Sequence, residues 1–515
     1  MRADTAAEVL VLAPVLGVLC AALAVVVLDL VRLDRDGRRS GGLALAGLAV
    51  SGLLAWRAWP SMGTVAFVPA GGGAGLLVLD GFGAFVTWVV LLAAAVTVTV
   101  SMGYARRRRF DQAEYYALTL VAAAGMMALA LANELIVLFL LLEGFSLALY
   151  ILCGFARGDG PGLEAALKYF VLGSVAGGFF LYGAALTFAA TGTTQLDAVA
   201  ARLADGAQGV PLLALVGFGL LVVGLGFKTA LVPFHQWAPD VYYGAPAPVV
   251  GFMAAATKAA AFAALARVLW TGFGPLAAQW TPLLSVLAVA TMVIGNVTAL
   301  VQSDLKRMLG YSAVAQAGYV LASLLAGTAA GVSAALYYLL VYALMNVGVI
   351  AVLVAIGPDS AGRDASRLDD VRGLSARHPG LALAVFLLAL VGLPPTAGFV
   401  GKWYIFEALV AAGRTPLAVA VVLNSVVAAI YYARPVLLAY AAPAGSQRPI
   451  TVDTPTAVAV GTTALVVGLA VVLTGPLAGA ARAAGALGAV EAPRSEQTEA
   501  PALFFTAPTF QKGAP

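Results

Sequence analysis

The chain has 515 residues, of which 62% are hydrophobic and only 10% are charged. Soluble domains carry about 25% charged residues, so this composition excludes an ordinary soluble protein. The formal net charge of +4 is small and spread over the loops, which does not suggest nucleic-acid binding. Apolar runs of the roughly 20 residues that cross a bilayer recur along the chain without strand-like alternation. They predict an all-α polytopic membrane protein, because hydrocarbon does not tolerate unpaired backbone groups.

The apolar runs predict about 14 membrane-spanning helices. The first run is too long for the apolar part of a signal peptide and follows no basic segment, so we expect it to be retained. Cys20 and Cys153 lie inside apolar runs, where we expect neither a disulfide nor a metal site. The expected spans, in chain order, are 8–31, 41–59, 76–101, 113–131, 134–155, 163–189, 211–232, 247–270, 281–301, 308–326, 331–356, 380–411, 415–440 and 455–476.

Basic residues predict the orientation of these spans. More than half of the 29 lysines and arginines fall in loops that follow odd-numbered spans, most densely at Arg106–Arg109. Basic loops stay in the cytoplasm, so both termini are expected on the extracytoplasmic side. The remaining basic residues include four lysines inside spans: Lys168, Lys228, Lys258 and Lys402.

Prolines interrupt two of the expected spans beside a lysine. Lys228 precedes Pro233 in the seventh span, and Lys402 follows Pro394 and Pro395 in the twelfth. These broken spans fit two five-helix repeats, spans 4–8 and 9–13. An odd number of spans inverts the second repeat, as in transporters that bind ions on discontinuous helices. The expected domains are 1–110 (helices 1–3), 111–270 (first repeat), 281–440 (second repeat), 450–480 (helix 14) and 485–515 (a polar tail, expected to be disordered).

Three of the intramembrane lysines are candidates for proton transfer. A charge at mid-bilayer costs about 2.5–3.5 kcal/mol on insertion scales, so such residues are kept for ion paths, proton relays or pairing. Burial disfavours the charged form of a lysine and a nearby carboxylate favours it, so the proton can leave when the partner moves. Lys228, Lys258 and Lys402 all fall inside their spans, and Lys258 lies near the middle of its span. The missing N–H of Pro233 also frees the carbonyl of Thr229, which predicts a polar gap beside Lys228.

Three further candidates have simpler alternatives. Glu143, near the middle of the fifth span, belongs either to the relay or to a structural ion pair. Lys168 lies near the end of the sixth span, where it can also reach the surface or pair with Glu164 one turn away. His235 can exchange a proton near neutral pH, but it can equally be a loop histidine. With two histidines and no fitting motif, no metal, haem or dinucleotide site is expected.

Four stretches of sequence resemble the antiporter-like membrane subunits of respiratory complex I, NADH:quinone oxidoreductase, and most closely the subunit N branch. They are ALKYFVLGS, FKTALVPFHQWAPDVYYGAPAPVVGFMAAATKAAAF, NVTALVQSDLKRMLGYSAVAQAGY and GLPPTAGFVGKWYIF. The resemblance extends from about Leu76 to Tyr440 and implies 14 helices with two inverted repeats. It departs from the family at Gln316, which stands where a histidine is common and is expected to hold water rather than a proton.

The resemblance also implies a function. It predicts a subunit that translocates protons through a buried Glu/Lys relay, driven by electron transfer from NADH to quinone in partner subunits. The chain itself is expected to bind no NADH, FMN, iron–sulfur cluster or quinone, and to have no redox centre. Expected partners are lipid and membrane-arm subunits like M, K and J, in a bacterial cell membrane. The alternatives are a subunit of a multi-subunit Na+/H+ antiporter, a stand-alone solute transporter and a structural spacer. The implied relay residues are Glu143, Lys168, Lys228, Lys258 and Lys402, with His235 as a further candidate.

Overall fold

The computed structural model describes residues 2–31, 38–59, 62–68, 75–108, 110, 113–156, 158–205, 212–358, 362–374, 378–441, 452–469 and 474–485. The tail that the sequence predicts to be disordered lies outside these residues, apart from Gly485.

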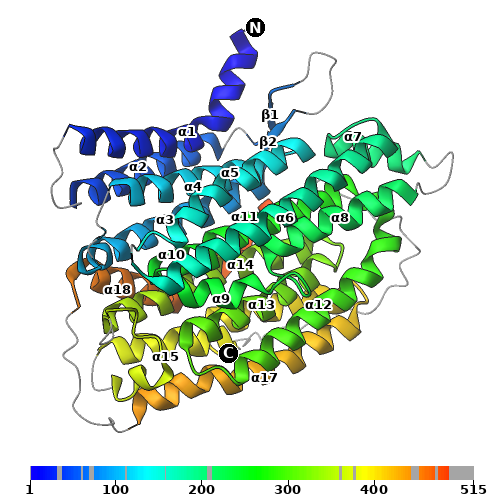
Figure 1. Ribbon diagram of the computed structural model, residues 1–515. Coiled ribbons are helices and arrows are strands. Elements are labelled where there is room, and N and C mark those ends of the chain that lie inside the picture. Colours follow the sequence, from blue (N-terminus) through cyan, green and yellow to red (C-terminus); the bar gives the residue numbers. More distant parts are fainter. Residues whose placement is uncertain are drawn as a thin grey trace, which may run out of the picture.

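Helices make up nearly all of the described chain, which confirms the predicted all-α fold (Figure 1). Each expected span contains one helix or consecutive helical segments, although the third, 76–101, becomes helical only at Gly81. The helices are α1 (Arg2–Leu30), α2 (Arg38–Ala58), α3 (Gly81–Arg107), α4 (Ala113–Leu131), α5 (Leu135–Cys153), α6 (Gly160–Thr191), α7 (Leu196–Ala204), α8 (Leu212–Thr229), α9 (Trp237–Gly244), α10 (Ala247–Phe252), α11 (Lys258–Ala266), α12 (Ala277–Leu300), α13 (Leu305–Leu324), α14 (Ala329–Ile356), α15 (His378–Val391), α16 (Ala397–Ala411), α17 (Thr415–Tyr440), α18 (Thr454–Leu469) and α19 (Thr474–Ala484).

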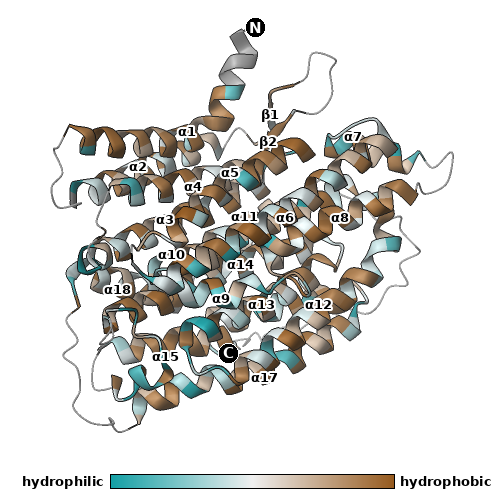
Figure 2. Cartoon of the chain, viewed as in Figure 1, coloured by the Kyte–Doolittle hydropathy of each residue, from teal (hydrophilic) through white to brown (hydrophobic). Residues whose placement is uncertain are grey.

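Within the described residues, 11 helices are long and apolar enough to cross a membrane. The other three expected spans differ for physical reasons. Helix α13 is long enough but carries Lys306, Arg307 and Gln316, the twelfth span is divided into α15 and α16, and α18 has only 16 residues. Figure 2 shows hydrophobic residues along the bodies of the helices and hydrophilic residues gathered toward their ends.

The core of the bundle is formed by α14 and by the helix that runs from Ala247 to Gly272. Nearly every residue of these two segments is buried, whereas α6, α12 and α17 leave a large share of their apolar residues exposed. A helix that is apolar all round belongs in the interior, and an outward apolar face suits lipid or a neighbouring subunit. The central helix contains two π-helical turns, Met253–Thr257 and Arg267–Gly272.

Both interrupted spans are broken where the sequence predicted. Helix α8 ends at Thr229 and α9 begins at Trp237, while α15 ends at Val391 and α16 begins at Ala397. Each break starts with a left-handed residue, Ala230 (φ 60°) in the first and Gly392 (φ 83°) in the second. A left-handed residue after the last helical turn is a common way to end a helix, and the following prolines prevent its continuation.

A short hairpin and helix α7 were not expected from the sequence. Strands β1 (Thr64–Ala66) and β2 (Leu77–Leu79) pair antiparallel, with Val65 opposite Val78. Strand β1 lies in an expected loop, but β2 occupies the start of the expected third span, 76–101, so the helical prediction was wrong there. Strands of three residues carry too little pattern to be recognised in the sequence.

Candidate functional site

Lys228 lies in the last turn of α8 and is only 2% exposed. Its ammonium donates hydrogen bonds to Ser146 Oγ (2.6 Å) and to the Tyr169 hydroxyl (2.9 Å). It also lies 4.8 Å from the ring centroids of Phe145 and Tyr169. Neutral oxygens and aromatic faces stabilise a cation without neutralising it. The charge of Lys228 is therefore not locked by a bonded carboxylate.

Glu143 lies on α5, three residues before Ser146, and lines the same cavity as Lys228. It is partly exposed, and no ion pair within 4.0 Å joins it to Lys228 in the described part of the chain. The space around its carboxylate comes from α6, where a methyl group at Gly177 would overlap Glu143. Because Gly177 has no side chain, the Glu143 carboxylate has room beside Lys228.

Lys258 directly follows the π-helical turn Met253–Thr257 and is 4% exposed. Its ammonium donates to the carbonyl oxygens of Thr229 (2.9 Å) and Ala313 (2.6 Å). The Thr229 carbonyl is the one that Pro233 leaves without a helical partner, and the sequence predicted it to be free beside Lys228. In the structure this carbonyl accepts a hydrogen bond from Lys258, so the break in the seventh span provides an acceptor for the lysine of the eighth span.

Lys402 lies in the second turn of α16 and is 8% exposed. Its ammonium donates to the carbonyl oxygens of Leu390 (3.2 Å) and Val391 (2.9 Å), and lies 5.0 Å from the centroid of the Tyr319 ring. These carbonyls end α15, where a helix has no N–H groups left to bond them. Lys402 and Lys258 are therefore bound in the same way, by carbonyls that a helix break sets free.

Lys168 and His235 lie apart from these three lysines. Lys168 is 42% exposed and forms ion pairs with Glu164 (2.6 Å) and Asp240 (2.8 Å). The Glu164 contact is the local pair that the sequence left open as an alternative. His235 is partly buried in the break after α8, and its Nδ1 has no hydrogen-bond partner among the described residues. In that part of the chain, no hydrogen bond or ion pair joins Lys168 or His235 to the three lysines.

Sequence reasoning missed a buried ion pair between Lys306 and Asp364 (2.8 Å) at the loop end of the bundle. Asp364 also accepts hydrogen bonds from the Tyr104 hydroxyl (2.8 Å) and the backbone N–H of Ala247 (3.1 Å), at the start of α10. Burial raises the pKa of the Asp364 carboxyl, but the Lys306 ammonium, the Tyr104 hydroxyl and the charge of Arg108 outweigh it, so its pKa lies below the ordinary value. The two residues are 58 positions apart in the sequence, so no local sequence pattern predicts their pairing.

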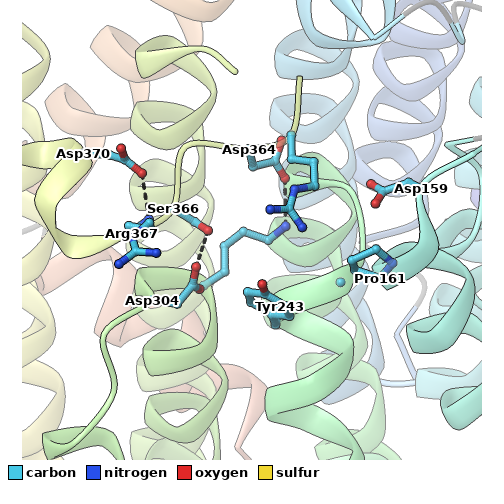
Figure 3. A pocket seen from close by; sticks show the side chains of 11 residues that line it. Asp159, Pro161, Tyr243, Asp304, Asp364, Ser366, Arg367 and Asp370 are labelled. Carbon is cyan, nitrogen blue, oxygen red and sulfur yellow. Dashed lines mark hydrogen bonds and ion pairs between the residues drawn. The ribbon is translucent and has the colours of Figure 1, made fainter. Parts of the chain in front are cut away.

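Asp304 lines a pocket together with Lys306 and Asp364. It caps α13 by accepting a hydrogen bond from the backbone N–H of Arg307 (2.9 Å), and it accepts another from the hydroxyl of Ser366. Figure 3 shows Asp304 with Ser366 on one side of the pocket and Asp364 on the other. Burial raises the pKa of Asp304, although hydrogen bonds from Ser366 and the Arg307 backbone act against this rise.

These features define a class of protein: a helical membrane protein with buried lysines on or beside two broken helices, as ion- and proton-translocating subunits have. The family described as NADH:quinone oxidoreductase/Mrp antiporter, TM matches residues 132–428. The chain is 42% identical over 467 residues to NADH-quinone oxidoreductase subunit N of Chloroflexus aggregans, covering 88% of this chain and 93% of that one.

Solved structures agree with this comparison. A chain of respiratory complex I from Thermus thermophilus with bound aureothin matches with a TM-score of 0.76 and 36% identity, over 91% of this chain and 99% of that one. A chain of the Mrp complex from Dietzia sp. DQ12-45-1b matches with a TM-score of 0.80 at 21% identity, over 93% and 97%, which shows a shared fold. The chain therefore belongs to the NADH:quinone oxidoreductase/Mrp antiporter transmembrane family, in its subunit N branch. The resemblance drawn from the sequence motifs is confirmed.

Proposed function

We propose that this chain is a membrane-arm subunit of NADH:quinone oxidoreductase that moves protons across the membrane, driven by electron transfer in other subunits. One observation supports this most strongly. Lys228, Lys258 and Lys402 are nearly fully buried, and their ammonium groups bond only neutral acceptors among the described residues. A lysine kept for structure alone is expected to have a carboxylate partner, as Lys306 has.

The proton path that we propose begins with Glu143 and Lys228, which share one cavity. With the Glu143 carboxylate near, Lys228 holds its proton; when the carboxylate moves away, the charged form loses its partner and the proton leaves. Lys258 binds the carbonyl of Thr229, the residue next to Lys228, so it is the next acceptor. The proton then passes to Lys402 and leaves through the second repeat. His235 remains a candidate link between Lys228 and Lys258, and Lys168 a candidate on the cytoplasmic side.

The chain's surroundings in this proposal follow from the same family. Its partners are lipid and other membrane-arm subunits, of the M, K and J types. NADH, FMN, iron–sulfur clusters and quinone are bound by partner subunits, and this chain is a translocase without a redox centre. It lies in a bacterial cell membrane with both termini on the extracytoplasmic side, as its basic loops predict.

The test is the NADH-driven proton gradient in inverted membrane vesicles that contain the whole complex with Lys228→Ala. NADH oxidation is followed in the same sample, and assembly of the complex is checked by native electrophoresis. We expect gradient formation and NADH oxidation to fall at least about ten-fold. A positioned proton-transfer group can contribute more than this, but water can partly replace the missing ammonium. An assembled complex with unchanged pumping and oxidation would refute the proposal.

The alternative is a subunit of a multi-subunit Na+/H+ antiporter, which the fold shared with the Mrp complex favours. The two proposals differ in their partners and in their ion. Co-purification of the chain with redox subunits, together with a gradient that forms without sodium, supports the first. A gradient that requires sodium and no NADH supports the second.

A further inference from the structure

A cluster of buried hydroxyl groups adjoins residues next to both Lys258 and Lys402. It joins Ser312 and Gln316 of α13, Tyr338 of α14 and Tyr432 of α17, all at most 1% exposed. The Ser312 and Tyr432 hydroxyls are hydrogen-bonded to each other, Gln316 Nε2 donates to the Tyr432 hydroxyl (3.2 Å), and the Tyr338 hydroxyl donates to Gln316 Oε1. The Gln316 amide is thus hydrogen-bonded to two tyrosines.

One end of this hydroxyl cluster lies beside Lys258. Ser312 directly precedes Ala313, whose carbonyl accepts the Lys258 ammonium at 2.6 Å. The backbone segment that binds the lysine therefore also carries the first hydroxyl of the cluster.

The other end lies beside Lys402. Tyr338 packs against Gly401, where an added Cβ would lie 2.8 Å from the tyrosine ring. Tyr319, one turn after Gln316 on α13, has its ring 5.0 Å from the Lys402 ammonium. The hydroxyl cluster therefore has neighbours in the surroundings of both lysines.

We propose that the hydroxyls of Tyr432 and Tyr338 carry the proton between Lys258 and Lys402, and that Gln316 holds them in position. This inference rests on the proposed function and names the groups that connect its two lysines. The balance is one proton: the Lys258 ammonium becomes an amine, and the Lys402 amine becomes an ammonium. Each hydroxyl oxygen on the way takes one proton and releases its own, so no charge stays on a tyrosine and no electron moves.

The amide of Gln316 cannot itself take part in these transfers. Its nitrogen only donates and its oxygen only accepts, so a proton that crossed it would leave an imidic acid behind. The proton therefore passes around the amide, through the hydroxyls and water between them. Gln316 is therefore a positioning residue. Like a histidine it can hold the two tyrosine hydroxyls by hydrogen bonds, but unlike a histidine it does not gain or lose a proton.

Phenylalanine substitutions test the hydroxyls without removing the rings. In vesicles containing the whole complex, Tyr432→Phe and Tyr338→Phe should each lower the NADH-driven proton gradient and NADH oxidation about five-fold or more. This is less than a positioned proton-transfer group contributes in a dry site, because water can partly replace a hydroxyl. Both variants should also enlarge the ratio of rates in H2O and D2O, which a purely structural role would not change.

Tyr342→Phe is the matched control. Tyr342 lies one turn beyond Tyr338 on α14, with ring centroids 6.3 Å apart, and its hydroxyl has no hydrogen-bond partner in the described part of the chain. It should leave pumping, oxidation and the isotope ratio unchanged. An equal loss in all three phenylalanine variants would show that the tyrosines act through packing and would overturn the inference.

A variant of Lys402 separates this inference from the function on which it rests. If Lys402→Ala lowers pumping while Tyr432→Phe and Tyr338→Phe do not, the hydroxyl path is wrong and the proposed function stands. If Lys402→Ala also pumps normally, the proposed function fails with it. Gln316→Leu should resemble the two tyrosine variants, whereas Gln316→His should keep more activity and gain a pH dependence near the histidine value of about 6.5.

Discussion

A single methyl group at Gly177 should weaken coupling without weakening the fold. In Gly177→Ala the new methyl overlaps the Glu143 carboxylate, which must move about 1 Å to regain ordinary contact. The carboxylate ends a flexible side chain, so the shift costs little stability. The two charges are more than 4.0 Å apart; taking about 5 Å and an effective dielectric constant of about 20, a shift of one ångström away from Lys228 removes about 0.5 kcal/mol of attraction. The equilibrium that holds the proton on Lys228 then changes about two- to three-fold.

The assay is the NADH-driven gradient in vesicles, with oxidation and assembly measured on the same preparation. Gly177→Ala should assemble normally and pump two- to three-fold more slowly. Gly178→Ala is the control, because an added Cβ there meets nothing within 4 Å. Equal rates in the two variants would refute the argument that Glu143 acts through its distance from Lys228.

The remaining predictions concern the two ion-paired lysines. Lys168→Gln should assemble normally, since its exposed ion pairs contribute about 0–1 kcal/mol each, and should lower pumping in the same vesicle assay because glutamine cannot carry a proton; pumping at the unmodified rate would remove Lys168 from the proposed path. Asp364→Asn leaves the Lys306 ammonium buried without its counterion, which costs about 3–5 kcal/mol, so scanning calorimetry of the solubilised complex should show a midpoint lower by several degrees. Because the folded pKa of Asp364 is lowered, its stabilisation is complete above the unfolded value of about 3.9 and is lost as the pH falls through the folded value. Acid should therefore lower the midpoint of the unmodified complex more than that of Asp364→Asn; equal acid sensitivity would contradict this.

The helices were predictable because each property that defines them is local. Apolar runs set the spans, and the prolines and glycines around Thr229 and Val391 set the two breaks. The same reasoning found Lys228, Lys258 and Lys402, because a charge inside an apolar run is visible without knowing its neighbours.

The partners of these residues were not predictable, because they come from distant parts of the chain. The acceptors of Lys258 lie 29 and 55 residues away, and the hydroxyl that Lys228 binds on Ser146 is 82 residues away. The π-helical turn before Lys258 consists of Met, Ala and Thr, which carry no local signal for a wider turn. The ion pair between Lys168 and Glu164 was predictable, because the two residues are four positions apart on one helix.

The two carbonyls that bind Lys258 belong to different halves of the bundle, Thr229 to α8 and Ala313 to α13. A charged ammonium attracts both oxygens and draws the halves together, whereas a neutral amine holds them weakly. Linkage makes this effect reciprocal. Protonation of Lys258 favours the state in which α8 and α13 are close together. Separation of α8 from α13 therefore lowers the proton affinity of Lys258 by the same free energy. If Lys258 carries the proton as proposed, a displacement of the bundle at this seam releases the proton, and proton uptake reverses the displacement.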